Sequence, residues 1–412
     1  MSDIRPFRGL RPRPDLVAKV ASPPYDVLDS AEAREMAAGN PYCFLRVSKA
    51  EIDLPPDADV HGEDVYRKSV ENFRRMIDQG VLAFDDEPSF YVYRLRMGDH
   101  VQRGLVAGVS AQEYEDGAIK KHEHTRREKE DDRARHTEML RANAGPVLLT
   151  YKHRDDIGAL IEKACAPAPI VDFVAPDGIG HTLWRVSDPG LVEGIRDAFR
   201  RVDAIYIADG HHRSASGYRV RNLFRDRNPQ HTGQEAYNYF LATLFPDDEL
   251  RIMGYHRVVR DLNGLTMEDF LARVAQSFEV APTAGAEPSG VHEFGMFLEN
   301  RWYRLTAKPG TYPADHPVKS LDASILQDNL LAPILGIDDP RTSGRIDFVG
   351  GIRGAGELER RCRTDMKVAF ALYPVSVAQL MAIADANEVM PPKSTWFEPK
   401  LRSGVVVRSL DD

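Results

Sequence analysis

Cysteine is scarce in this sequence, and none of its cysteines forms a recognisable motif. Cys43, Cys165 and Cys362 lie far apart, so we expect neither a disulfide framework nor a zinc ribbon. The sequence also lacks an apolar leader in its first residues and an apolar run long enough to span a membrane. These absences predict a reduced, cytoplasmic protein without a membrane segment.

The sequence also has no excess of positive charge. The 54 lysines and arginines are outnumbered by 63 aspartates and glutamates, which gives a formal net charge of −9. Because nucleic acids and anionic membranes attract basic surfaces, we expect neither of them as a partner. The length of 412 residues predicts two or three lobes, and nothing in the sequence indicates the oligomeric state.

Strand-like and helix-like patterns alternate along the whole chain. The expected fold class is therefore α/β in the broad sense, a mixed α+β protein with mixed sheets and several hairpins. The segment 281–290, rich in Ala, Gly and Pro, is the best candidate linker, although it can equally be a long loop. We expect lobes at 1–155, 156–285 and 286–412, and hairpins near 89–110, 170–187, 236–259 and 292–307.

The most informative stretch is an apolar run that ends in Asp209-Gly210 and is followed by a helical pattern. A strand that leads into a helix N-terminus forms an anion site, because free N–H groups and the helix dipole point the same way. The next residues, His211, His212 and Arg213, add groups that bind phosphate. The segment is neither a Walker loop nor a dinucleotide fingerprint. The alternative is a structural helix start whose histidines bond locally to the backbone.

A second candidate is the charged run from Lys120 to Leu140, for which the sequence predicts a helix. At about 100° per residue, five cationic or titratable side chains fall on one stripe: His122, Arg126, Lys129, Arg133 and His136. A stripe of this kind is typical of a helix that faces polyphosphate. The alternative is a solvated helix with internal salt bridges. Metal binding by His122 and His124 would require a strand, on which both rings share a face.

Two stiff, proline-containing segments add further candidates. Pro23 and Pro24 fix the backbone before Tyr25 and Asp26, so these side chains can be presented rigidly, or the segment can be a packed arm. Near the C-terminus, Lys393 and Lys400 flank Ser394-Thr395-Trp396-Phe397, which suits phosphate contacts, or the segment can be a structural strap.

Four motifs together resemble the signatures of the DUF1015 family. They are Ser22-Pro23-Pro24-Tyr25-Asp26-Val27, Lys121-His122-Glu123-His124-Thr125 with Asp132-Arg133, Ala208-Asp209-Gly210-His211-His212-Arg213, and Pro392-Lys393-Ser394-Thr395-Trp396-Phe397-Glu398-Pro399-Lys400. Because they are spread over nearly the whole chain, the resemblance implies one family domain overall. Membership of this family implies no particular reaction.

A more distant resemblance concerns the segment from Gly210 to Arg213, which is similar to the Gly-x-x-Arg motif of the ParB/sulfiredoxin superfamily. In that superfamily the motif opens a helix and holds nucleotide phosphates, which implies a ParB/sulfiredoxin-like strand–loop–helix core here. Sulfiredoxins carry cysteine at the position of His211, and ParB proteins carry a second arginine at the position of Ala215. The resemblance therefore favours neither sulfinate reduction nor a CTP-dependent clamp. The segment from Asp209 to Arg213 resembles the Asp-Gly-x-x-Arg motif of the free serine kinases more than it resembles the motifs of sulfiredoxins or ParB proteins.

The leading hypothesis is a nucleotide-dependent small-molecule phosphotransferase, with a free amino acid such as serine as acceptor. Gly210 and the helix start would hold the phosphates of ATP or ADP, while His212 and Arg213 neutralise developing charge. Asp209 would hold Mg²⁺ or accept the hydroxyl proton, His211 completes the catalytic group, and Asp26 is a second candidate base. Nucleotide-binding residues would be His122, Arg126, Lys129, Arg133, His136, Lys393 and Lys400.

Two other classes of function remain open. One is a nucleotide-sensing or binding module without turnover. The other is a phosphatase or hydrolase that uses a metal held by Asp209 and the two adjacent histidines.

Overall fold

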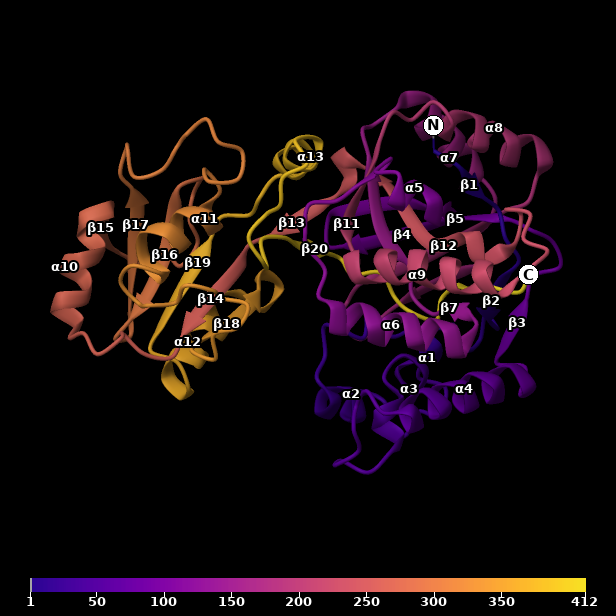
Figure 1. Cartoon of the computed structure of the whole chain (residues 1–412), viewed down its shortest axis with the longest axis horizontal. Coiled ribbons are helices and arrows are strands. Elements are labelled where there is room, and N and C mark those ends of the chain that lie inside the picture. The colour runs from indigo at the N-terminus through magenta and orange to yellow at the C-terminus, as the bar shows by residue number, and fades with distance from the viewer. Residues whose placement is uncertain (1) are drawn as a thin grey trace. The chain divides into compact units, whose positions relative to one another are not determined.

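The computed structural model describes residues 2–412, which divide into two compact units (Figure 1). The first unit runs to Leu250 and also takes in Pro399–Asp412, and the second is Arg251–Glu398. The chain thus leaves the first unit once and returns to it for its last residues.

A nine-stranded mixed sheet forms the centre of the first unit. Its order is β6-β11-β8-β12-β5-β4-β10-β9, with β1 paired to β5. The pairs β11–β6 and β12–β8 are parallel, and the other pairs are antiparallel. The strands are β1 (Ile4–Arg5), β4 (Phe90–Met97), β5 (His100–Ser110), β6 (Ile119–Lys120), β8 (Val147–Tyr151), β9 (Val171–Val174), β10 (Gly180–Val186), β11 (Ile205–Asp209) and β12 (Tyr239–Pro246).

A small antiparallel sheet joins the two ends of the chain within the first unit. It has the order β3-β2-β21-β7, so the C-terminal strand β21 lies between two strands from the first 143 residues. This pairing fixes the segment that carries Lys400. The strands are β2 (Gly9–Pro12), β3 (Leu82–Phe84), β7 (Ala142–Asn143) and β21 (Val407–Ser409).

The helices of the first unit pack in pairs. Helices α6 and α9 lie side by side (Figure 1), joined by Arg219–Glu130 at 3.5 Å and Arg227–Glu138 at 2.7 Å. Helices α7 and α8 pack together and contribute Ile161, Ile195 and Phe199 to the core of the large sheet. The helices are α1 (Val17–Val20), α2 (Ser30–Met36), α3 (Leu45–Ser48), η1 (Ala50–Asp53), α4 (Glu63–Asp78), α5 (Ala111–Glu115), α6 (Arg127–Leu140), α7 (Asp155–Ala164), α8 (Pro189–Phe199), α9 (His211–Arg227), η2 (Ala236–Asn238) and η3 (Asp247–Glu249).

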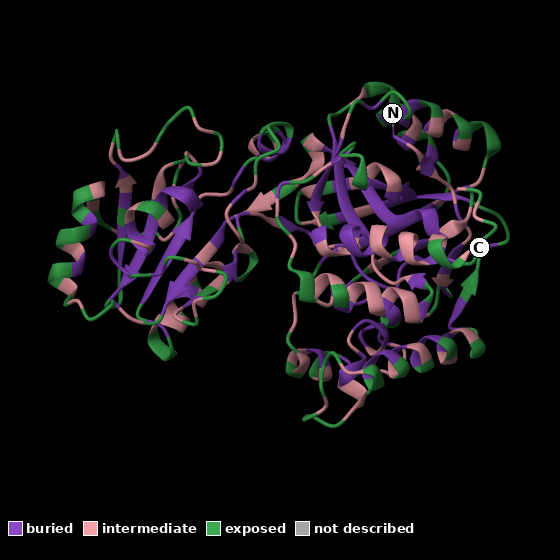
Figure 2. Cartoon of the chain, in the orientation of Figure 1, coloured by how far each residue is buried: buried purple, intermediate pink, exposed green. Residues whose placement is uncertain are grey.

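The second unit is built on a six-stranded antiparallel sheet of order β15-β17-β16-β19-β14-β18 and a two-stranded ribbon, β13–β20. Its core gathers apolar side chains of the sheet, of α10 and of α11. Figure 2 shows the central strands of both units as buried. The elements are β13 (Arg251–Met253), β14 (Tyr255–Val259), α10 (Met267–Ser277), β15 (Phe278–Thr283), β16 (Glu293–Leu298), β17 (Arg301–Ala307), α11 (Asp322–Leu326), η4 (Gln327–Leu331), β18 (Ile346–Gly350), η5 (Gly351–Arg353), α12 (Gly354–Thr364), β19 (Val368–Leu372), α13 (Val377–Asp385) and β20 (Trp396–Glu398).

The mixed α+β fold class is confirmed, and so are three of the four hairpins. The pairs β4–β5, β9–β10 and β16–β17 form where the alternating patterns predict them. The hairpin predicted at 236–259 is wrong. β12 pairs with β5 and β8, whereas β14 pairs with β18 and β19. An alternating pattern identifies a strand, but it does not identify the partner of that strand.

The compact units differ from the three expected lobes. Strands from 1–155 and 156–285 share the large sheet, so no boundary falls between those segments. The candidate linker 281–290 begins within β15 and continues as a loop to β16, inside the second unit. No helix within residues 2–412 has both the length and the apolar character needed to cross a membrane.

Candidate functional site

The strand–loop–helix predicted around Asp209 is present at β11–α9. β11 lies between β6 and β8, and its pairing with β8 is irregular between Ile207 and Asp209. Gly210 follows with φ 98°, a left-handed conformation that favours glycine, and α9 begins at His211. The N-cap residue, Gly210, has no side chain with which to cap this helix. A helix start is a place where backbone N–H groups and the helix dipole favour an anion.

Asp209 is paired with a lysine from the C-terminal segment. The Lys400 Nζ donates to Asp209 Oδ2 at 2.7 Å. Burial alone would raise the pKa of Asp209, but the positive charges of Lys400 and Arg213 lower this pKa to about 2. The carboxylate is therefore ionised throughout the neutral range. The structure thus brings two predicted site residues, 191 positions apart, into direct contact.

Arg213 lies between the proline-rich N-terminal segment and the loop before β8. Its Nη1 donates to the Pro146 carbonyl at 2.8 Å, and its Nη2 lies 3.5 Å from Asp26 Oδ1. Its guanidinium carbon is 5.2 Å from the centre of the Tyr25 ring. Burial, with the nearby Asp26 charge, raises the pKa of Tyr25 to about 12, so the phenol stays neutral. The prediction that Tyr25 and Asp26 are presented rigidly is consistent with these contacts.

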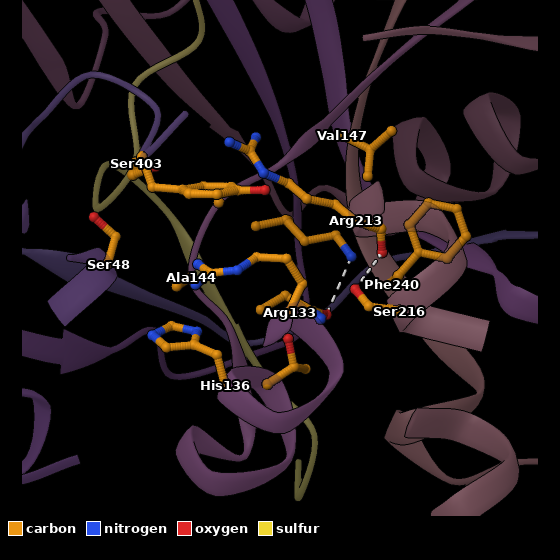
Figure 3. A pocket seen from close by; sticks show the side chains of 14 residues that line it. Ser48, Arg133, His136, Ala144, Val147, Arg213, Ser216, Phe240 and Ser403 are labelled. Carbon is orange, nitrogen blue, oxygen red and sulfur yellow. Dashed lines mark hydrogen bonds between the residues drawn. The ribbon is translucent and has the colours of Figure 1, made fainter. Parts of the chain in front are cut away.

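A small pocket lies at this place, and two arginines reach into it. Figure 3 shows Arg133 from α6 and Arg213 from α9 lining the same pocket. The Arg133 guanidinium carbon lies 4.1 Å from the Tyr25 ring centre. The free volume of about 40 Å³ is room for ordered water or for one small anionic group. Gly145 borders the pocket, and a Cβ there would come within 2.9 Å of Ser403 Oγ.

His122 and His211 meet edge to face beside this junction. Their ring centres are 4.4 Å apart, and the exposed fractions of the side chains are 1% and 5%. Burial lowers the pKa of His122 to about 4 and, together with His122, holds the pKa of His211 well below its usual range. Both rings are therefore neutral. Glu123 Oε2 lies 3.8 Å from His211 Nδ1.

His212 points to a different partner. Its Nε2 accepts a hydrogen bond from the Arg126 backbone N–H at 3.1 Å, which joins the loop before α6 to the first turn of α9. The two adjacent histidines thus serve different contacts. The interpretation in which both bind one metal together with Asp209 loses support, because His212 Nε2 is already an acceptor.

The predicted cationic stripe does not form as a single helical face. β6 occupies Ile119–Lys120 and α6 begins only at Arg127, so His122 and Arg126 precede the helix. Only Arg133 and His136 of the five line the pocket.

His136 is not a cation. Its Nε2 lies 3.0 Å from both the Ser69 hydroxyl and the Val47 carbonyl, and burial lowers its pKa to about 4. Part of the predicted stripe therefore faces the packed interior against α4.

Lys129 and Lys393 are not brought to this pocket by any described contact. Lys129 is half-buried on α6. Lys393 belongs to the second unit, where its Nζ lies 5.5 Å from the Tyr255 ring centre. Their participation in nucleotide binding stays a prediction.

Three residues that sequence reasoning missed help to shape the site. Pro146 supplies the carbonyl that holds Arg213, Gly145 leaves room beside Ser403, and Glu123 joins the two buried histidines. Glu123 could have been identified from the sequence as a candidate ligand, because it adjoins His122 in a run rich in metal-binding residue types.

The geometry defines an α+β protein in which Asp209, Lys400 and Arg213 meet at the β11–α9 junction. Residues 4–324 match the family described as "Protein of unknown function (DUF1015)", and the chain belongs to this family. Among curated proteins, none matches the chain.

Several solved structures are weakly similar. A mutant of a free serine kinase in complex with AMP has 12% identity and a TM-score of 0.36, with 71% of this chain and 87% of that chain covered. A conserved hypothetical protein from Pyrococcus furiosus has 14% identity and a TM-score of 0.35, with coverage of 75% and 96%. C-terminally truncated SbnI from Staphylococcus aureus has 11% identity and a TM-score of 0.35, with coverage of 71% and 82%.

Proposed function

We propose that this protein binds the phosphates of ATP or ADP at the β11–α9 junction and transfers a phosphoryl group to a small-molecule hydroxyl. A free amino acid such as serine is the first acceptor to test. The observation that carries the proposal is the meeting of Asp209, Lys400 and Arg213 at the start of α9, whose N-cap residue is Gly210. Phosphoryl transfer depends on positioning and charge neutralisation, which are what these groups can supply.

Arg213 is the principal phosphate ligand in this proposal. Its contact with Asp26 is 3.5 Å long and the Asp26 side chain is 49% exposed, so the pair is weak. A phosphate can displace this carboxylate, because it offers the guanidinium fork shorter and doubly charged contacts. The Pro146 carbonyl would keep the arginine in place during the exchange. Displacement would also release Asp26 beside the phosphate, as the second candidate base requires.

Asp209 suits the binding of a cation better than the acceptance of a proton. A carboxyl whose pKa is about 2 is a weak base at neutral pH. Mg²⁺ is usually held by one or two carboxylates together with phosphate oxygens, and an ionised Asp209 fits that donor set. Mg²⁺ bound with the nucleotide would neutralise phosphate charge. Lys400 would orient the carboxylate and add a further positive charge.

The pocket has room for one small anionic group and is lined by Arg213 but not by Asp209 or Lys400, so a nucleotide would enter it with one phosphate and its nucleoside would lie outside. Arg133 and Arg213 both lie against the Tyr25 ring, which would help to position the two guanidinium groups toward the bound anion.

The test uses the purified protein with Mg-ATP or Mg-ADP and a panel of amino acids and sugars. Nucleotide binding is measured by calorimetry, and product is followed by phosphorus NMR. Arg213→Ala should abolish binding and turnover, whereas Arg219→Ala, further along α9 in ion pairs with Glu130 and Asp131, should retain both. If turnover with every acceptor is no faster than with Arg213→Ala, the transferase proposal is wrong. Tight binding without any product would favour a nucleotide sensor.

A further inference from the structure

We propose that His122, Glu123 and His211 form a binding site for a divalent transition-metal ion of the Zn²⁺ or Fe²⁺ type. Each residue offers one ligand atom, and the three atoms lie within 4.8 Å of one another. The site joins the loop before α6 to the first turn of α9. It is distinct from the Asp209 carboxylate, and the proposal does not depend on nucleotide binding.

The first argument is the state of the two imidazoles. Both side chains are more than nine-tenths buried. Neither nitrogen of His122, nor Nε2 of His211, makes a hydrogen bond of good geometry within the part of the chain that the structure describes, although the Ile207 backbone lies near enough to His122 to act on its pKa. Buried polar atoms nearly always have a partner, and an ion or an ordered water is the usual explanation where the protein supplies none. An ion takes one nitrogen from each ring, so it would satisfy one of the two His122 nitrogens. His211 would bind it through Nδ1, which lies toward Glu123, or through the unpartnered Nε2.

The second argument is the donor set. Two imidazoles with one carboxylate is the combination that holds catalytic zinc in one class of enzymes and Fe²⁺ in another. Mg²⁺ and Ca²⁺ prefer sets made of oxygen atoms only, so they fit this trio poorly. Three protein ligands leave at least one coordination position for water or for an oxygen of a bound molecule.

The third argument is that the geometry is close to that of a metal site. Ligands about 2.1 Å from a tetrahedral zinc lie about 3.4 Å from one another. His211 Nδ1 and Glu123 Oε2 are 3.8 Å apart and all three ligand atoms lie within 4.8 Å of one another, so the side chains would have to draw closer together around an ion. The negative charge of Asp209 acts on both imidazoles and would also favour a cation.

A metal here would position the phosphate-binding elements. The loop that contains His122 and Glu123 continues to Arg126, whose N–H is bound by His212. Ligation by His211, the first residue of α9, would hold this loop against the helix start next to Gly210. A metal at this site is compatible with phosphoryl transfer to a hydroxyl and with hydrolysis, because either a hydroxyl or a water molecule can occupy the open coordination position.

The experiment titrates Co²⁺ into chelator-treated protein produced without a polyhistidine tag. Co²⁺ replaces Zn²⁺ and reports its geometry through visible absorption. We expect one equivalent to bind and to raise the melting temperature of the wild-type protein. The metal content of untreated protein, measured by mass spectrometry, identifies the natural ion.

Matched variants separate this site from surface binding. Glu123→Gln preserves shape and should weaken Co²⁺ binding by at least about tenfold, and His211→Asn should remove the absorption and the thermal shift. His124→Asn, at an exposed histidine of the same loop, should behave as wild type. Arg213→Ala should keep the metal while losing nucleotide, which distinguishes the two proposals. No Co²⁺ binding by folded wild-type protein, or wild-type affinity in both ligand variants, would overturn the inference.

Discussion

Each unit contains a strand that leads into a helix, and the two helices differ in how their first turns are capped. In the second unit β19 leads to α13, whose first turn is closed by its own side chains. The Ser376 hydroxyl accepts from the Gln379 N–H at 3.1 Å, and Gln379 Oε1 accepts from the Ser376 N–H at 2.9 Å. This capping box satisfies two free N–H groups of the helix. In the first unit β11 leads to α9, whose N-cap residue, Gly210, has no side chain that could form such a box.

The residues around the α9 start would be poor choices for stability alone. Arg213 places a cation in the first turn, where the helix dipole favours an anion. Asp209 is the residue best placed to supply a negative charge, but it is bound to Lys400. An anion from outside the protein would remove the conflict at α9, whereas α13 has no comparable conflict to remove. The difference between the junctions therefore favours phosphate binding at α9 only.

The largest expected effect comes from Asp209→Asn. The amide keeps the shape of the side chain but loses the charge that would hold Mg²⁺ and that pairs with Lys400. We expect turnover to fall by about 100-fold or more, with weaker effects on nucleotide binding. Steady-state kinetics and calorimetry measure the two effects separately. Asp385→Asn, at the exposed end of α13, is the control in the other junction. Equal turnover by both variants would contradict a role for Asp209.

The next effect concerns acid stability in the first unit. The folded state lowers the pKa of His136 to about 4, below the value of about 6.5 in unfolded chains. The unfolded state therefore binds more protons as the pH falls from 6.5 toward 4, and the stabilising contribution present above pH 6.5 is lost in that range. From pH 7 to pH 5 we expect a loss of about 2 kcal/mol from this residue.

His136→Gln should reduce this loss, because glutamine does not titrate. His256, in the second unit, also has a pKa lowered to about 4 by burial, so His256→Gln is the matched control. Urea unfolding followed by the fluorescence of Trp184, in a background with Trp302→Phe and Trp396→Phe, reports on the first unit. The same pH dependence in His136→Gln and in wild type would show that His136 is not responsible.

The sequence predicted the β11–α9 junction well, because its signal is local. An apolar run, Asp209-Gly210 and a helical pattern follow one another within a few residues. In the structure β11 ends at Asp209 and α9 begins at His211, with Gly210 between them in a left-handed conformation. The confirmed hairpins are local in the same way.

Long-range contacts could not be predicted in this way. The Lys400–Asp209 pair depends on β21 entering a sheet with β2 and β7, which no local pattern encodes. The prediction of a cationic stripe that includes His136 was wrong for another reason. A one-sided pattern on a helix is the same whether that side faces a ligand or the protein interior, and here His136 faces Ser69 of α4. Lys400 and Asp209 were both candidates, but only the fold brings them together.

Gly210→Ala tests the backbone of the α9 junction. At φ 98° a Cβ is strained, although the nearest atom outside the turn, in Val147, would be 3.5 Å away. We expect a loss of about 1–2 kcal/mol of unfolding free energy, with weaker nucleotide binding. The control is Gly158→Ala, inside α7 with open space around it, which should be neutral or stabilising. Urea denaturation compares them, and equal stabilities would mean that the turn relaxes freely.

The smallest expected effect is that of Ser376→Ala in the second junction. Loss of the cap at α13 should cost about 1 kcal/mol, as measured by hydrogen exchange of the α13 amides. Nucleotide binding should not change, because neither Ser376 nor Gln379 is among the residues proposed to bind the nucleotide. Addition of phosphate should not restore the lost stability either, whereas it should stabilise the α9 amides in the wild-type protein. If phosphate protects α13 in Ser376→Ala as strongly as it protects α9, an uncapped start alone is sufficient for the binding, and Arg213 and Lys400 are not what distinguishes the first junction.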